Sequence, residues 1–219
     1  MIPLESKVNT AVAAFIANVS DRDMHRIIDE RILPEEMFSS IGGRSFDLFA
    51  CVLAAFYFAE EQHLTKKMRS QIISELINRI PGFRKSSEDV SSREMFSEKA
   101  KWQINIDTIS VDLSRYARDA EKRAEEIQHA DALVVSDDEI LNGEPVFSGT
   151  RVPIRTIAAW VRDKISPEEI KKSYPAVTDE MLHLAPIWAT THPMRGRPKS
   201  FGDLNPTWKV KTKYKVKLG

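Results

Sequence analysis

The stretch SDRDMHRIIDERILPEEMFSSIGGRSFDLFACVLAAFYFAEE, residues 20–61, decides the fold that this sequence predicts. Ser20 is placed to cap a helix, because its side-chain oxygen can accept a hydrogen bond from a first-turn amide, and Pro34 ends that helix. Gly42 and Gly43 lie between two short apolar stretches, which is typical of a tight β-hairpin. The uncharged run over residues 48–59 then predicts a buried helix. The order is therefore helix, hairpin, helix.

The flanking residues extend this pattern in both directions. The stretch AVAAFIANVS places Ala11, Val12, Phe15 and Ile16 on one helical face, and a turn follows at Asn18. Residues 65–80 predict another helix, because Met68, Ile72 and Leu76 recur at a spacing of four. We therefore expect a mainly α protein whose residues 1–83 form a winged helix-turn-helix unit.

Residues 84–131 are expected to connect this unit to a second one. The first part is rich in serine and charge, KWQINIDTISVDL alternates polar and apolar residues as a strand does, and a helix follows. The apolar stripe of that helix consists of Leu113, Tyr116, Ala120, Ala124 and Ile127. This stripe predicts either the seam of a homodimer or a helix that packs on its own domain.

Residues 132–194 are expected to form a second small helix-turn-helix unit with a short β element. The stretch ALVVS reads as a strand, and Pro153 fits the first turn of a helix in which Ile157, Trp160 and Val161 are buried. Ser166 and Thr178 mark the starts of two further helices. Residues 195–219 form an extended basic tail.

Charge is divided unevenly along the 219 residues, although 32 basic and 32 acidic side chains give a net charge of zero. The net charge is −2 over residues 1–80, −5 over residues 81–194 and +7 over residues 195–219, where eight basic residues meet one acidic residue. The basic element is therefore the tail.

The sequence excludes several classes of protein. The longest uncharged apolar run is too short to span a bilayer, no signal-peptide pattern precedes it, and the single Cys51 has no partner for an intramolecular disulfide. The absence of a signal peptide pattern predicts a cytoplasmic protein. Five scattered histidines and the absence of catalytic or phosphate-loop motifs predict that it is not an enzyme and uses no cofactor or metal.

Residues 8–78 resemble the winged helix-turn-helix of MerR-type regulators, which place a short helix, a bend, a wing and a long apolar helix in this order. The resemblance implies DNA binding by Arg22, His25 and Arg26 on the recognition helix and by Arg44 in the wing. The sequence lacks the effector-sensing cysteines of that family, and Asp21, Asp23 and Asp29 lie beside these cations.

A second resemblance covers DDEILNGEPVFSGTRVPIRTIAAWVRDKISPEEIKKSYPAVTDEML. This stretch looks like a family of small helix-turn-helix domains, formerly of unknown function and now mostly regarded as antitoxins. The residues that carry the resemblance are Gly143, Pro145, Gly149, Thr150, Arg151, Val152, Pro153, Ser166, Glu168, Glu169, Tyr174 and Pro175.

That second family occurs in toxin-antitoxin operons of the VapBC type, and the whole chain is similar to the larger VapB-like antitoxins of mycobacterial type. The resemblance implies a PIN-domain ribonuclease as the toxin partner. Arg151 and Arg155 are candidate DNA contacts, although Arg151 is also placed to fix the turn before Pro153.

The tail offers a surface for an acidic partner. RGRP at residues 195–198 resembles an AT-hook, and from Trp208 onward lysines alternate with other residues, which suits strand addition to a sheet edge. The candidate toxin-binding residues are Arg195, Arg197, Lys199, Trp208, Lys209, Lys211, Lys213, Tyr214, Lys215 and Lys217. The alternatives are contact with the DNA backbone and a strand of the chain's own fold.

The sequence thus predicts a type II antitoxin that neutralises a VapC-like PIN-domain ribonuclease and represses its own operon by binding operator DNA as a homodimer. One alternative is a free-standing transcription regulator without a toxin. Another is a protein-interaction module in which neither helix-turn-helix unit contacts DNA.

Overall fold

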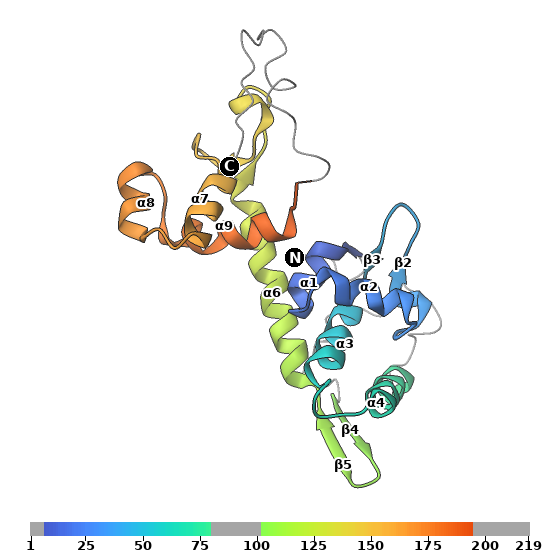
Figure 1. The fold of residues 1–219 in the computed structure, drawn as a ribbon. Coiled ribbons are helices and arrows are strands. Elements are labelled where there is room, and N and C mark those ends of the chain that lie inside the picture. The colour runs from blue at the N-terminus through green and yellow to red at the C-terminus, as the bar shows by residue number, and fades with distance from the viewer. Residues whose placement is uncertain (1–6, 80–101, 195–219) are drawn as a thin grey trace, which may run out of the picture.

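The computed structural model describes residues 7–79 and 102–194, and this part of the chain is mainly helical (Figure 1). Its helices are α1 (Thr10–Ala17), α2 (Asp21–Asp29), α3 (Leu48–Ala59), α4 (Lys66–Arg79), α6 (Ser114–Ala132), α7 (Ile154–Arg162), α8 (Pro167–Ser173) and α9 (Asp179–Thr191). Its strands are β1 (Val8–Asn9), β2 (Phe38–Ser39), β3 (Ser45–Phe46), β4 (Gln103–Ile106), β5 (Ile109–Asp112), β6 (Val134–Val135) and β7 (Val146–Phe147). Two short 3-10 turns, Glu35–Met37 and Leu141–Gly143, complete the set.

Local side-chain chemistry fixes the start of α2. The Ser20 hydroxyl accepts a hydrogen bond from the Asp23 amide at 3.1 Å, and the Asp23 carboxylate accepts one from the Ser20 amide. This reciprocal capping satisfies two amides that have no partner inside the helix. The predicted turn at Asn18 is confirmed, since Asn18 ends α1 in the left-handed region with a φ of 54°.

The predicted hairpin around the two glycines is confirmed, and we call residues 38–46 the glycine hairpin. Strands β2 and β3 pair antiparallel with Phe38 opposite Phe46, and Gly42 and Gly43 turn the chain with φ values of +72° and +125°. Strand β1, which the sequence did not predict, adds to the other edge of β3. This hairpin lies beside α2 (Figure 1).

Helix α3 is the centre of the N-terminal half. The Asp47 carboxylate caps it by accepting a hydrogen bond from the Ala50 amide at 2.6 Å, and residues 49–57 of the helix are all buried. The predicted buried helix is therefore confirmed. Helices α1 and α6 pack on it, and the core continues without a break into the C-terminal helices.

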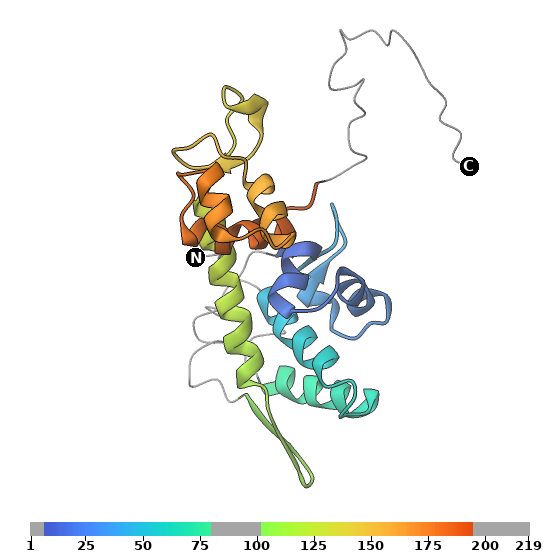
Figure 2. The same cartoon turned by 60° about the vertical axis from the view of Figure 1, so that its left-hand side comes forward.

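Helix α6 runs along both halves of the molecule (Figure 2). Its predicted apolar stripe, including Tyr116, Ala120 and Ile127, is buried against α1, α3 and α9 of the same chain. Of the two interpretations of this stripe, packing within the chain is correct and the dimer seam is wrong. A second copy has no access to these side chains, because other helices of the chain already cover them.

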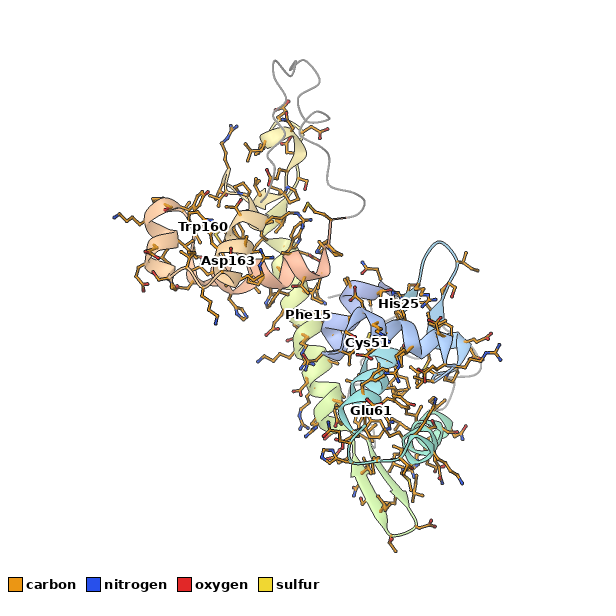
Figure 3. The ribbon with its side chains drawn as sticks, in the orientation of Figure 1. Phe15, His25, Cys51, Glu61, Trp160 and Asp163 are labelled. Atoms are coloured by element: carbon orange, nitrogen blue, oxygen red, sulfur yellow. The ribbon has the colours of Figure 1, made fainter. Side chains whose placement is uncertain are left out.

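The C-terminal half holds the expected strand and three short helices. Ser166 and Thr178 cap α8 and α9 as predicted, and α9 packs between α6 and α7. The prediction that Trp160 and Val161 are buried is wrong, because α9 covers the opposite face of α7 and leaves them partly exposed. Figure 3 shows Trp160 on the side of α7 toward α8, where its ring lies 5.3 Å from that of Tyr174.

Two further findings concern the sequence predictions. None of the helices in residues 7–79 and 102–194 is long and apolar enough to cross a membrane. The extended pattern predicted over KWQINIDTISVDL is confirmed as the antiparallel β4–β5 hairpin, with Ile104 opposite Val111. The predictions for the serine-rich segment and for the basic tail lie outside the described residues.

Candidate functional site

Helix α2 presents one face to solvent and anchors the other in the core. Met24 and Ile27 are fully buried, whereas Arg22 is exposed and His25 and Arg26 are partly exposed. Figure 3 places His25 on this helix, beside the glycine hairpin. Three of the predicted DNA-binding residues are therefore brought onto one helix at the surface.

Arg26 is held in place by its neighbours. Its guanidinium lies 3.2 Å from the Asp23 carboxylate and 2.8 Å from that of Glu30, and its central carbon lies 5.1 Å from the centre of the Phe58 ring. Burial alone would raise the pKa of Asp23, but hydrogen bonds from Ser20 and Arg26 outweigh it and lower that pKa. Arg26 therefore pairs with two neighbouring acidic residues, Asp23 in α2 and Glu30 at its end.

Arg44 joins the glycine hairpin to α2. Its two guanidinium nitrogens donate to the Asp29 carboxylate at 2.8 Å and 3.2 Å, and one of them also lies 3.4 Å from the His25 carbonyl oxygen. A bidentate pair of this kind fixes orientation as well as distance. The hairpin and α2 consequently form one surface.

The acidic residues that flank the predicted cations are mostly paired. Asp23 pairs with Arg26, Asp29 pairs with Arg44, and the second oxygen of Glu30 lies 3.0 Å from the Lys66 ammonium. Arg22, in contrast, makes no hydrogen bond or ion pair within the described residues. The surface of α2 is thus close to neutral, with Arg22 as a cation that is accessible to a phosphate.

The two arginines predicted in the second unit differ in role. The Arg155 guanidinium donates to the His192 carbonyl oxygen at 2.8 Å and lies 4.9 Å from the Trp188 ring, so it ties α7 to the end of α9. Arg151 is exposed. The turn before Pro153 is instead held by Thr150, whose hydroxyl donates to the Phe147 carbonyl oxygen at 2.9 Å and accepts from the Val152 amide at 3.1 Å.

A strongly acidic surface lies where α6 ends, and none of its carboxylates is among the site residues predicted from the sequence. Residues 124–150 contain no lysine or arginine. We call the following exposed carboxylates the acidic end: Asp131, Asp137, Asp138, Glu139 and Glu144. Within the described part of the chain, one member of the acidic end forms an ion pair: Asp131 Oδ1 lies 3.6 Å from His192 Nε2.

Metal-binding groups and Cys51 are the sequence features that bear most directly on chemistry at a site. No three histidine, cysteine, aspartate or glutamate side chains of residues 7–79 and 102–194 are grouped to hold a metal ion. Cys51 is fully buried, and this burial raises the pKa of its thiol well above the usual value. Its thiol has the environment of a packing group rather than that of a nucleophile.

A groove lies between the α1–α2 turn, the end of α3 and α6. Both arginines that line it have partners in the chain: Arg115 lies 3.5 Å from Glu60, and Arg123 donates to the Ile16 carbonyl oxygen at 3.1 Å. Tyr116 donates a short hydrogen bond to Glu60, and burial together with this carboxylate raises the pKa of Tyr116 to about 12. These contacts hold α6 on the N-terminal half.

One protein family matches the C-terminal half of the chain, and two known proteins align with most of its length. Residues 134–189, from β6 to α9, match the model of a family described as "Protein of unknown function (DUF433)". An X-ray crystal structure of Rv2018 from Mycobacterium tuberculosis aligns with 85% of this chain and 98% of its own, with 18% identity and a TM-score of 0.34. The uncharacterized protein y4eO of Sinorhizobium fredii is 36% identical over 192 residues, which cover 88% of this chain and 84% of that protein. The chain therefore belongs to the family of y4eO.

Proposed function

We propose that the chain is a type II antitoxin, in which the basic tail binds an acidic PIN-domain ribonuclease and the N-terminal half binds operator DNA. The observation that carries the proposal is the division of charge. The last 25 residues have a net charge of +7, whereas residues 1–80 and 81–194 have net charges of −2 and −5. A protein built in this way presents an anionic partner with one cationic segment.

The chemistry of the tail suits the active site of a PIN-domain nuclease. Such a site is a cluster of carboxylates that holds divalent cations, so lysine ammonium groups are complementary to it in charge. Lys209, Lys211, Lys213, Lys215 and Lys217 alternate with other residues, which would direct them to one face of an extended segment. Bound there, the tail would occupy the metal sites or the path of the RNA.

The N-terminal half supports the DNA-binding part of the proposal through the contact between α2 and the glycine hairpin. Arg44 and Asp29 hold the two elements together at 2.8 Å, which lets a helix and a hairpin approach one duplex as a unit. Because its acidic residues are largely paired, this surface does not strongly repel phosphates, and Arg22 is available to contact one. Few phosphate contacts imply weak binding unless a dimer doubles them.

The proposal is tested by affinity purification from the native host. We expect the full tagged chain to retain a small acidic protein with PIN-type carboxylates, identified by mass spectrometry, and a chain that ends at Pro193 to lose it. A variant in which the five lysines at positions 209 to 217 are glutamines serves as the matched control for charge at constant length. Retention of no such protein by the full chain would overturn the antitoxin proposal.

A free-standing transcription regulator is the second candidate, and the RGRP stretch at residues 195–198 favours it. In that case the tail is a DNA arm that inserts arginine into narrow A·T-rich minor grooves. Operator affinity would then lose most of its salt dependence when the tail is removed, because the released counterions are those displaced by the tail.

A further inference from the structure

Strand β6 has one unpaired edge. Its residues pair with β7 on one side only, Val134 opposite Phe147 and Val135 opposite Val146, and no other strand of the described residues joins the sheet. The far side of β7 is occupied, since Val146 bridges to Pro153. The outer edge of β6 is therefore the position at which this sheet can accept another strand.

Hydrogen bonds show which backbone groups this edge presents. The Leu133 carbonyl oxygen accepts from the Ser148 amide at 2.8 Å, so Leu133 points toward the β7 side. Because the direction of the backbone polar groups alternates along a strand, those of Val134 and Ser136 point away from β7. Val135, with 39% of its surface exposed, adds apolar area beside them.

The surroundings of this edge select for a cationic strand. β6 leads directly into Asp137, Asp138 and Glu139 of the acidic end, and Asp131 precedes it at the end of α6. Figures 1 and 2 both show the end of α6 and residues 136–147 together at one end of the molecule. The carboxylates at positions 137, 138, 139 and 144 form no ion pair with a lysine or arginine of the described chain.

The basic tail starts beside this surface. Helix α9 ends at Thr191, and the next residue, His192, places its Nε2 atom 3.6 Å from Asp131 at the end of α6. From residue 195 to Trp208 the chain can extend by roughly 40 Å at about 3.3 Å per residue, so the lysine-rich segment can reach β6. A tether of this length also gives the segment a high effective concentration at the edge.

We propose that the segment from Trp208 to Leu218 docks on the outer edge of β6 in the same molecule, as an added strand whose lysines face the acidic end. The segment alternates lysine with Val210, Tyr214 and Val216, which is the pattern of a strand with one cationic face. Its +5 charge over residues 209–217 meets five carboxylates of the acidic end. The tail thereby neutralises the chain's own surface.

Docking in this way would cover the lysines of the tail with carboxylates of the same molecule. The lysines are kept from nonspecific nucleic acid until a more acidic partner competes for them. The identity of that competitor rests on the proposed function, whereas the docking itself needs no toxin and is measured in its absence.

The test is paramagnetic relaxation in the full-length, isotope-labelled chain, with Lys213→Cys carrying a nitroxide. Cys51 is fully buried, so the label reacts at position 213. We expect the amide signals of Val134, Val135 and Ser136 to lose most of their intensity, and those of the β4–β5 hairpin to keep theirs. High salt should restore the lost signals, because the attraction is electrostatic.

Charge variants distinguish docking from chance proximity. Asp138→Asn, Glu139→Gln and Glu144→Gln together should restore the β6 signals, whereas the matched set Glu35→Gln, Glu36→Gln and Asp107→Asn on other surfaces should not. The spectrum of each variant reports directly whether it is folded.

A mixture of two differently labelled chains distinguishes docking within one molecule from docking between two molecules. An isotope-labelled chain without nitroxide, mixed with an unlabelled chain that carries it, should keep its β6 signals. Equal losses in the mixture, no loss in the single chain, or a loss that the acidic-end variant leaves unchanged would each overturn the proposal. Any of these results leaves the purification experiment free to support toxin binding, and a failed purification leaves the docking result intact.

Discussion

The surface of α2 and the acidic end differ in how far their carboxylates are paired within the chain. On α2, Asp23, Asp29 and Glu30 each lie within 3.2 Å of a cationic side chain of the same chain. At the acidic end, four of the five carboxylates have no such partner in the described residues. Charges of the first region therefore stabilise contacts within the chain, whereas those of the second are available to a partner.

The largest effect is expected from the core beneath the acidic end. Phe147 on β7 is fully buried, so Phe147→Ala should lower the free energy of unfolding by about 3–5 kcal/mol through lost burial and a cavity. Urea denaturation measures this loss, and Val135→Ala on the adjacent, partly exposed strand should cost less than about 1 kcal/mol. Similar small losses for both variants would show that this region is separate from the common core.

Asp47 gives the N-terminal half a pH-dependent contribution to stability. Burial is the main reason that the pKa of this capping carboxyl is raised to about 6, although hydrogen bonds from backbone amides oppose the rise. A raised pKa stabilises the folded state below about pH 4, and this stabilisation is lost as the pH rises through about 6.

Asp47→Asn keeps a capping oxygen but does not titrate. The free energy of unfolding of the wild type, relative to this variant, should therefore fall by roughly 1–3 kcal/mol between pH 4 and pH 7. Denaturation series at both pH values provide the measurement. If the difference in free energy of unfolding between the two chains were the same at both pH values, the raised pKa of Asp47 would be contradicted.

Arg44 tests whether paired charges on α2 fix the shape of its surface. Removing its bidentate contact with Asp29 by Arg44→Ala should cost about 0.5–1 kcal/mol, since the pair is partly solvated. Amide exchange in the glycine hairpin should become faster at the same time. Arg151→Ala, at an exposed arginine, is the control and should change neither quantity; equal effects of both substitutions would remove the structural role of Arg44.

Arg22 should have no measurable effect on stability and a modest one on DNA binding. If it contacts a phosphate, Arg22→Ala should reduce the slope of log affinity against log salt by about 1. Titration of a duplex from the chain's own upstream region at several salt concentrations gives the slope. Lys67→Ala, an exposed cation on α4, should leave the slope unchanged. An unchanged slope for Arg22→Ala would exclude Arg22 as a phosphate contact.

Local chemistry explains most of what the sequence predicted correctly. The caps at Ser20, Ser166 and Thr178 each act on the amide three residues away, and the paired glycines determine their own turn. Such features depend on neighbours in the sequence, so a pattern indicates them without knowledge of the fold.

The site depends on contacts that sequence patterns do not contain. Arg44 meets Asp29 across 15 residues, and Arg155 meets the His192 carbonyl across 37, so these two of the cations predicted for DNA are engaged within the chain. The burial of Trp160 was overestimated because periodicity identifies an apolar side chain but not the helix that covers it; the side chain is partly exposed. The acidic end has a signal in the sequence, since residues 124–150 contain no lysine or arginine, but the sequence does not show that cations from other parts of the described chain leave most of these carboxylates unpaired.

The central claim is that this chain inhibits a nuclease through its tail. The most direct measurement is RNA cleavage by a PIN-domain protein that the full chain retains in the purification, with the full chain, the chain that ends at Pro193 and the five-glutamine tail variant added in turn. The account predicts that the full chain stops cleavage and that the other two leave it nearly unchanged. Equal inhibition by the truncated chain, or cleavage that continues with the full chain, would contradict it.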